Sequence, residues 1–253
     1  MQLKRVDQAL VDLGLAPSKT KAQELIDGQA VERRERGGQW RLVKKPATSF
    51  NVEVHELRLC DNVEVLRYVS RGGLKLEGAL QDLNLDVKNL QVLDVGASTG
   101  GFTDCLLQHG VAHVTAIDVS SGEMASKILG DTRVKFIGNL NVRDLHKDRR
   151  ITKKFDLAVV DVSFISLTKV LPEVSGVLRP GGSMLALVKP QFEVGREHLY
   201  RRGIVKHPAE VDRAIERIIL LATEAGFLLR DVLKSKLKGK DGNQEYFLYA
   251  QKT

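Results

Sequence analysis

The chain of 253 residues contains only two cysteines, Cys60 and Cys105. Two thiols are too few for a disulfide framework and are typical of a reducing compartment, so we expect a cytoplasmic protein. The sequence also lacks a run of about 18 apolar residues, which a membrane-spanning helix requires. Asp7 interrupts the first apolar residues, and we therefore expect no membrane anchor. No bound metal ion is expected either.

Acidic residues are fewer than basic ones, 32 against 39, which gives a formal net charge of +7. Lysines and arginines that neutralise phosphates release counterions, so this excess favours a polyanionic partner. A basic soluble enzyme without such a partner explains the positive charge as well. The positions of the charged residues therefore have to distinguish between these two explanations. The length is sufficient for one complete α/β domain and an appendage of roughly 50 to 60 residues.

Two short helices are predicted in the first 30 residues, because apolar residues recur there twice at helical spacing. Gly14 and Gly28 each follow one of these segments as a stop, and Ser18 is a suitable N-cap for the second helix. Lys19 and Lys21 then lie in the first turn, where the helix macrodipole disfavours cations. A phosphate bound nearby would explain their placement, and a solvated basic face would explain it too.

A basic, proline-containing break over residues 43–49 follows these helices. The alternation of apolar and polar residues over Val52–Leu57 predicts a short edge strand. We place the domain boundary between Val65 and Ser70, ahead of a helix that carries Lys75.

A buried strand over residues 91–95 ends in Gly96 and leads into a glycine-rich loop and a helix. Such glycines let a ligand approach the backbone outside the carboxyl end of the strand. No Gly-Lys-Ser/Thr follows, and Asp94 would repel a pyrophosphate, so a positively charged ligand fits better. The next strand, 111–117, ends in Asp118, whose carboxylate can accept both hydroxyls of a ribose. Because dinucleotide sites have a similar spacing of roughly 20 residues, a nicotinamide cofactor is an alternative.

Ionisable residues follow or precede three further predicted strands. Two buried strands, over 155–160 and 183–188, deliver Asp161 and Lys189 to the carboxyl edge of the predicted parallel sheet. A turn over Arg179–Gly182 precedes the second of them. The last strand has an acidic residue at its start. Each of these groups on its own is an ordinary solvated residue of a sheet edge.

The run Leu93–Thr103 resembles the first motif of the FtsJ-like methyltransferases. This resemblance implies an α/β, Rossmann-like fold and S-adenosylmethionine as the cofactor. By the same likeness, two polar residues after the third strand would lie near the adenine, although a plain polar loop is an equal explanation. The residues expected at the cofactor are Asp94, Gly96, Ala97, Ser98, Thr99, Gly100, Gly101, Phe102, Asp118, Asn141 and Asp144.

Lys75, Asp161, Lys189 and Glu245 resemble the Lys-Asp-Lys-Glu tetrad of ribose 2′-O-methyltransferases. A ribose hydroxyl is a poor nucleophile, and its attack on a sulfonium methyl improves when a positioned base takes or shares the proton. The resemblance implies Lys189 as the hydroxyl activator, with Asp161 and Glu245 orienting it. Lys75 would be a second positioning or tuning cation.

The N-terminal segment resembles the S4 RNA-binding domain at Arg5–Asp7, Gly14–Leu15, Ser18–Lys19 and Gly28–Val31. It departs from the pattern over Glu32–Gly38, where such domains usually place a short hairpin turn. The resemblance implies a small α+β module that grips folded RNA by its shape and phosphates. The residues expected to contact RNA are Arg5, Ser18, Lys19, Lys21, Arg67 and Arg71.

Over the whole chain, the two segments together resemble the TlyA, or hemolysin A, family, with matching runs at Ser70–Leu76, Asp161–Leu167 and Val188–Glu193. The resemblance implies 2′-O-methylation of cytidine in ribosomal RNA of the large subunit, and in some members also of the small subunit. The expected domains are an S4-like domain over 1–64, a linker over 65–70 and an FtsJ-like domain over 71–253.

Two other classes of function remain open from the sequence. One is an RNA- or ribosome-binding protein whose methyltransferase fold is inactive, and the intact tetrad argues against it. The other is a membrane-lytic protein, for which the sequence offers neither a membrane span nor a long amphipathic segment. The oligomeric state is not predicted.

Overall fold

The computed structural model describes residues 3–28, 30–60, 67–239 and 241–253. The chain divides into two compact units, Met1–Leu74 and Lys75–Thr253. The boundary lies later than the expected 65–70 segment, of which 65 and 66 are outside the described residues. The physical reason is packing, because Leu74 contacts the core of the first unit and Gly73 lies against the Tyr68 ring.

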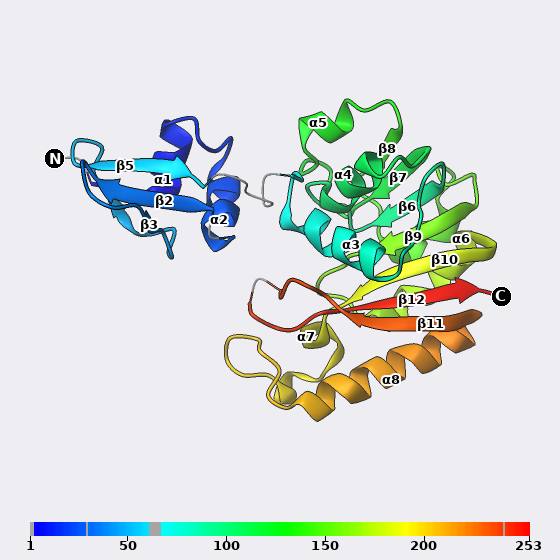
Figure 1. Ribbon diagram of the computed structural model, residues 1–253. Helices are drawn as coiled ribbons and strands as arrows, with labels where there is room; N and C mark the ends of the chain where they lie inside the picture. The colour runs from blue at the N-terminus through cyan, green and yellow to red at the C-terminus, as the bar shows by residue number, and fades with distance from the viewer. Residues whose placement is uncertain (1–2, 29, 61–66, 240) are drawn as a thin grey trace. The chain divides into compact units, whose positions relative to one another are not determined.

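The N-terminal unit is a small α+β fold with two antiparallel sheets (Figure 1). One sheet pairs β1 with β4, and the other has the order β3-β2-β5. Both helices turn an apolar stripe inward, and α2 is capped by the Ser18 hydroxyl, which accepts a hydrogen bond from the Lys21 amide. The elements are β1 (Lys4–Arg5), α1 (Val6–Asp12), α2 (Lys19–Asp27), β2 (Val31–Glu35), β3 (Arg41–Leu42), β4 (Ser49–Phe50) and β5 (His55–Leu59).

One prediction about this unit is wrong in detail. The edge strand begins at His55 and not at Val52, because Asn51 closes a turn: its side-chain oxygen accepts from the Glu53 amide and its carbonyl accepts from the His55 amide. The segment Glu32–Gly38, where the sequence departs from the S4 pattern, is mostly strand β2, and only its last residues turn.

The C-terminal unit is built on a seven-stranded sheet of order β11-β12-β10-β9-β6-β7-β8 (Figure 1). The strands from β10 to β8 are parallel, and β12 runs antiparallel between β10 and β11. This arrangement confirms the predicted α/β, Rossmann-like fold. The strands are β6 (Gln91–Val95), β7 (His113–Ile117), β8 (Val134–Ile137), β9 (Phe155–Val160), β10 (Leu178–Val188), β11 (Phe227–Lys234) and β12 (Tyr246–Lys252).

Helices cover both faces of this sheet. On one face, α6 and α8 bury Val174 and Ile218 in the same apolar core as the strand residues Val160 and Leu248. On the other face, the Phe102 ring of α4 stacks on Phe247 of β12. The helices are α3 (Arg71–Asp82), α4 (Gly101–Gln108), α5 (Ser126–Leu129), η2 (Val142–Lys147), η3 (Leu167–Lys169), α6 (Leu171–Val177), α7 (Pro190–Glu193), η4 (Arg196–His198) and α8 (Pro208–Glu224).

The turn predicted at Arg179–Gly182 is part of strand β10. The strand starts at Leu178, opposite Phe155 of β9, and the register shifts before Ser183. The extra residues form an irregularity in the strand, and Gly181 has the left-handed φ of 74° that this path requires. The glycines therefore bend the strand and do not end it.

Candidate active site

The glycine-rich loop after β6 passes close to the end of the neighbouring strand β9. Gly96 has a φ of 84°, and a Cβ atom on it would lie 2.4 Å from the Asp161 carbonyl oxygen. Only glycine fits there without a shift of backbone. Gly100, with a φ of 91°, then starts helix α4. Two glycines thus bring the loop over the carboxyl end of the parallel strands.

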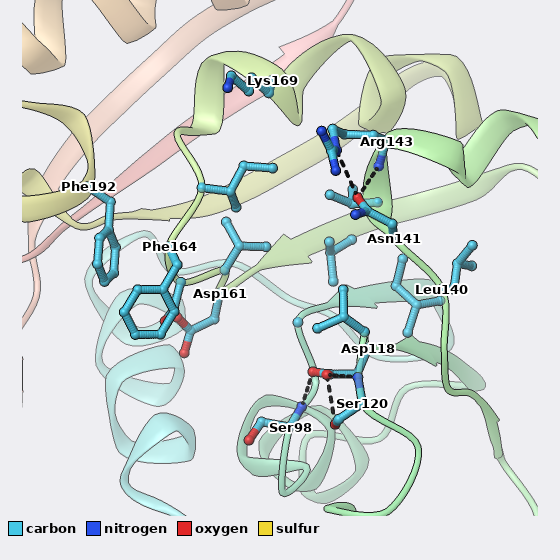
Figure 2. Close-up of a pocket in the computed structure, with 18 of the residues that line it drawn as sticks. Ser98, Asp118, Ser120, Leu140, Asn141, Arg143, Asp161, Phe164, Lys169 and Phe192 are labelled. Atoms are coloured by element: carbon cyan, nitrogen blue, oxygen red, sulfur yellow. Dashed lines mark hydrogen bonds between the residues drawn. The ribbon is translucent and has the colours of Figure 1, made fainter.

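Asp118 at the end of β7 holds this loop from the other side (Figure 2). Its Oδ2 accepts a hydrogen bond of 2.8 Å from the Ser98 amide. Its Oδ1 accepts from the amide and the hydroxyl of Ser120, at 2.8 and 2.9 Å. Hydrogen bonds from the loop after β6 and from the loop after β7 therefore orient the Asp118 carboxylate. This carboxylate faces the cavity described next.

A cavity of about 780 Å³ opens at the carboxyl ends of β6, β7 and β9. Its volume is within the range of roughly 300 to 1,000 Å³ that small-molecule sites occupy. Its walls combine apolar side chains with a few polar groups, among them Asp118 and Asn141 (Figure 2). The lining residues expected from the sequence to meet a cofactor are Gly96, Ser98, Asp118 and Asn141.

The other residues expected at the cofactor do not line this cavity. They lie under the loop, within it or on α4, except Asp144, which is exposed and 3.8 Å from the Lys147 ammonium. The side chain of Asn141 caps η2 by accepting from the Arg143 amide. The residues outside the lining are Asp94, Ala97, Thr99, Gly100, Gly101, Phe102 and Asp144.

Asp94 is fully buried beneath the loop. The Thr103 hydroxyl donates a hydrogen bond of 2.6 Å to its Oδ2, whereas its Oδ1 has no hydrogen-bond partner within the described part of the chain. Burial, helped by the nearby carboxylates of Asp161 and Asp118 and opposed by the Thr103 hydrogen bond, raises the pKa of Asp94 to about 7. Near neutral pH Asp94 is therefore only partly ionised, and its ionised form adds negative charge beneath the glycine-rich loop.

The four residues of the tetrad form two ion pairs. The Lys189 Nζ lies 2.5 Å from Asp161 Oδ1 and donates to the Ser163 hydroxyl at 2.9 Å. The Lys75 Nζ lies 2.6 Å from Glu245 Oε2, with side-chain exposures of 12% and 3%. Each lysine is therefore paired with one carboxylate of the set.

The strand register explains how these pairs come to one edge of the sheet. Val160, the last residue of β9, pairs with Val95 of β6 and Ala186 of β10. Val188 pairs with Tyr246, so the next position along this antiparallel pair holds Lys189 and the residue before Tyr246, Glu245. All three strand-end groups thus lie at the edge where the cavity opens.

Phe164 is a cavity residue that the sequence analysis did not select. Its side chain is 92% exposed, and its φ of 63° is in the left-handed region. Its ring centroid lies 5.1 Å from that of Phe192 (Figure 2). A bulky residue held exposed and strained beside a cavity indicates a functional surface. The sequence carried only a weak signal for it, an aromatic residue three positions after Asp161.

Glu193 holds the loop that carries Phe164. Its buried carboxylate accepts from the Ser166 hydroxyl at 2.6 Å and from the Leu167 amide at 2.9 Å. Burial raises the pKa of Glu193 above its ordinary range. Because Glu193 follows Lys189 by four residues, this contact ties the Lys189 strand end to the Asp161 loop.

The residues expected to contact RNA differ in their surroundings. Arg5 is half-exposed and pairs with buried Asp7 at 2.7 Å. Lys21 is largely buried, and its ammonium donates to the Tyr68 and Val69 carbonyls. Lys19 and Arg67 are exposed, and Arg71 is half-buried. Lys21 therefore has an evident structural role, whereas Lys19 and Arg67 present charge to solvent.

The sequence model of the FtsJ-like methyltransferase family matches residues 68–252 of the chain. The chain belongs to the FtsJ-like methyltransferase family. The predicted membership is thereby confirmed, while the first 67 residues lie outside the match and their S4 likeness stays a prediction.

Relatives of this FtsJ-like protein cover nearly all of its length. It is 39% identical over 249 residues to the 16S/23S rRNA (cytidine-2′-O)-methyltransferase TlyA of Mycobacterium tuberculosis. The aligned region covers 97% of this chain and 88% of that protein. It is 34% identical to Hemolysin A of Brachyspira hyodysenteriae, with 97% and 98% covered. The predicted likeness to the TlyA, or hemolysin A, family is therefore confirmed.

A solved structure supports the same relationship. A protein from Streptococcus thermophilus that carries the name hemolysin matches with a TM-score of 0.75 and 36% identity, over 100% of this chain and 90% of that one. In the part of this FtsJ-like chain that the structure describes, no helix has the length and apolar character needed to cross a bilayer.

Proposed function

We propose that this protein transfers a methyl group from S-adenosylmethionine to the ribose 2′-hydroxyl of a cytidine in ribosomal RNA. The observation that carries this proposal is the pairing of Lys189 with Asp161 and of Lys75 with Glu245 at the edge where the cavity opens. The name of the M. tuberculosis relative, a 16S/23S rRNA (cytidine-2′-O)-methyltransferase, supports the same reaction and acceptor.

The cavity fits S-adenosylmethionine, which supplies an activated methyl group on a cationic sulfur when it is bound. Asp118 offers an oriented carboxylate in the cavity wall that suits ribose hydroxyls. Ile117, Leu140 and Val142 give the wall an apolar portion that suits the adenine. The carboxylates around the loop favour a cationic ligand over a pyrophosphate, which disfavours the nicotinamide alternative.

Lys189 is the residue proposed to act on the substrate hydroxyl. Asp161 and Ser163 hold its Nζ, which leaves one direction on the nitrogen for an oxygen placed at the mouth of the cavity. In the reaction, Lys189 acts as the uncharged amine, whose lone pair takes the hydroxyl proton while the oxygen bonds to the methyl carbon and the methyl–sulfur bond breaks, and Asp161 keeps the Nζ in position. Alignment of the oxygen with the methyl group supplies most of the remaining acceleration.

Lys75 and Glu245 are proposed to complete the site as a second pair. Glu245 occupies the register position beside Lys189, so its carboxylate adds to the negative charge that faces the cofactor. Lys75 balances this buried carboxylate and keeps it in one orientation.

RNA as the acceptor is supported by features other than the tetrad. The net charge of +7 favours a polyanion, and Phe164 offers an exposed aromatic face beside the reacting edge. We further propose that the N-terminal unit is an S4-like RNA-binding module, with Arg5, Ser18, Lys19, Lys21, Arg67 and Arg71 contributing to its RNA contacts. A ribosomal substrate places the reaction in the cytoplasm.

The test is methyl transfer from radiolabelled S-adenosylmethionine to separated ribosomal subunits from a strain that lacks the gene. We expect label in the 2′-O-methyl group of a cytidine, and no label with a Lys189→Ala protein that still binds S-adenosylhomocysteine. Absence of transfer by the unaltered protein to either subunit and to naked ribosomal RNA would overturn the proposal in favour of an RNA-binding protein with an inactive fold.

A further inference from the structure

A short hairpin, Leu199–Val205, projects from the segment between α7 and α8. A bridge between Leu199 and Val205 closes it, and the Tyr200 amide donates to the Ile204 carbonyl at 2.8 Å. Gly203 has a φ of 77°, which completes the tight turn. The tip of this hairpin, Tyr200–Arg202, is therefore a defined turn and not an open loop.

Asn243 fastens the hairpin to the chain segment that carries Glu245. Its side chain is 4% exposed. Its Nδ2 donates to the Gly203 carbonyl at 2.9 Å, and its Oδ1 accepts from the Val205 amide at 3.0 Å. A buried amide that satisfies two backbone groups of another segment holds that segment in one place.

The same segment is stiffened on its own side. The Gln244 side chain donates to the Ser235 and Glu245 carbonyls, both at 2.9 Å, and the Ser235 amide donates to the Glu245 carbonyl. The positions of the hairpin and of the catalytic carboxylate are thus linked through short hydrogen bonds.

The tip carries charge and an aromatic ring that the fold itself does not use. The Tyr200 side chain is 58% exposed, and Arg201 and Arg202 are both exposed. Neither arginine forms an ion pair with a carboxylate within the described ranges. Adjacent free guanidinium groups beside an exposed tyrosine are suited to a sugar-phosphate backbone and its bases.

The distance from the tip to the catalytic edge is short. Asn243 and Glu245 are two residues apart, so the tip lies within about 20 Å of the Glu245 backbone when the Asn243 side chain and its hydrogen bond are added. A few nucleotides of a single RNA strand span this distance. A strand that enters the site can therefore reach the tip while its target nucleotide lies at Lys189.

We propose that the tip Tyr200–Arg202 binds the sugar-phosphate backbone of the substrate RNA a few nucleotides away from the ribose that is methylated. Arg201 and Arg202 contact phosphates, and Tyr200 contacts an adjacent sugar or base. The inference rests on the proposed function, because it assumes that RNA is the acceptor.

The test compares Arg201→Gln/Arg202→Gln with Arg149→Gln/Lys153→Gln. The control pair also removes two exposed cations from the C-terminal unit, but from the connection that leads to the start of β9, away from the carboxyl edge. Affinity for naked ribosomal RNA, its dependence on salt, and the kcat and KM of methyl transfer are measured for both. Affinity for S-adenosylhomocysteine reports on the integrity of the fold.

We expect the tip variant to bind RNA roughly tenfold more weakly or worse, because it loses two charge-assisted contacts to phosphates. The slope of log Kd against log salt should fall by about 1.4 for two lost phosphates of a single strand. KM should rise more than kcat falls, and Arg201→Lys/Arg202→Lys should restore part of the salt slope.

Unchanged RNA affinity and salt slope in the tip variant, in a protein that methylates RNA, would overturn the inference and leave the proposed function intact. An equal loss in the control variant would overturn it as well, because it would mean that only total charge matters. Absence of methyl transfer by the unaltered protein is the separate failure of the proposed function.

Discussion

Asp161 and Lys189 follow the ends of two neighbouring parallel strands, β9 and β10, and their side chains meet with 2.5 Å between Oδ1 and Nζ. Each residue is thereby positioned by strand register and not by a flexible loop. The pair is therefore held rigidly in position to act on a hydroxyl at the mouth of the cavity.

The first prediction concerns Lys189. Lys189→Ala should lower kcat for methyl transfer at least about 100-fold, because general base catalysis contributes roughly 10² to 10⁴. Binding of S-adenosylhomocysteine, measured by calorimetry, should remain. Lys153→Ala, at an exposed position ahead of β9, is the matched control and should keep its activity. Retained turnover in a folded Lys189→Ala protein would rule out the assigned role.

The second prediction concerns the buried pair of Lys75 and Glu245. Lys75→Met leaves the Glu245 carboxylate, 3% exposed, without its cation, and should lower the free energy of unfolding by about 3 to 5 kcal/mol. Lys75→Met/Glu245→Leu removes both charges and should recover most of this loss, although not the activity. Urea denaturation of the single and double variants measures both quantities. Additive losses would show that the two side chains do not interact.

The third prediction concerns Asp94, whose pKa in the folded protein is about 7 against an ordinary value of 3.8. The folded pKa is the higher one, so the native state holds a proton that the unfolded chain releases. The contribution of Asp94 to stability is therefore complete below about pH 4 and is lost as the pH rises to 7. Asp94→Asn should flatten this part of the curve of unfolding free energy against pH.

The same titration predicts how the cofactor binds. A cationic sulfonium near the loop favours ionised Asp94, so affinity for S-adenosylmethionine should rise between pH 6 and about 8 as the carboxylate loses its proton. Affinity for S-adenosylhomocysteine, whose sulfur is neutral, should change less. Calorimetry at the two pH values, with Asp94→Asn as the control, measures the difference. Equal pH dependence for the two ligands would contradict the prediction.

The last prediction concerns Phe164, which is exposed and has a φ of 63°. A left-handed conformation costs a bulky residue about 1 kcal/mol or more, and glycine adopts it freely. Phe164→Gly should therefore leave stability unchanged or raise it by about 1 kcal/mol, while it raises the KM for RNA. Thermal unfolding and steady-state kinetics check the two effects. Lower stability together with an unchanged KM would assign Phe164 a structural role.

The sequence alone determined the elements whose signals are local. Helical spacing and an N-cap predicted α1 and α2, and continuous apolar runs predicted β6 and β9, because neighbouring residues decide both patterns. It also pointed to Asp118, Asp161, Lys189 and Glu245, since each stands beside the end of a recognisable strand, whereas Lys75 was selected by the family resemblance.

Other features were decided by the tertiary structure. Lys75 and Glu245 are 170 residues apart, and only the packing of helix α3 beside the chain segment ahead of β12 brings them together. Asp94 lies near the end of β6 and Asp118 directly after β7, yet the first is sealed beneath the glycine loop and the second faces the cavity. The exposure of Phe164 and the clamp made by Asn243 likewise have no local signature. A pattern in the sequence depends only on residues that are close along the chain. Burial and side-chain pairing depend on which strands and helices pack side by side, and residues far apart in the sequence decide this.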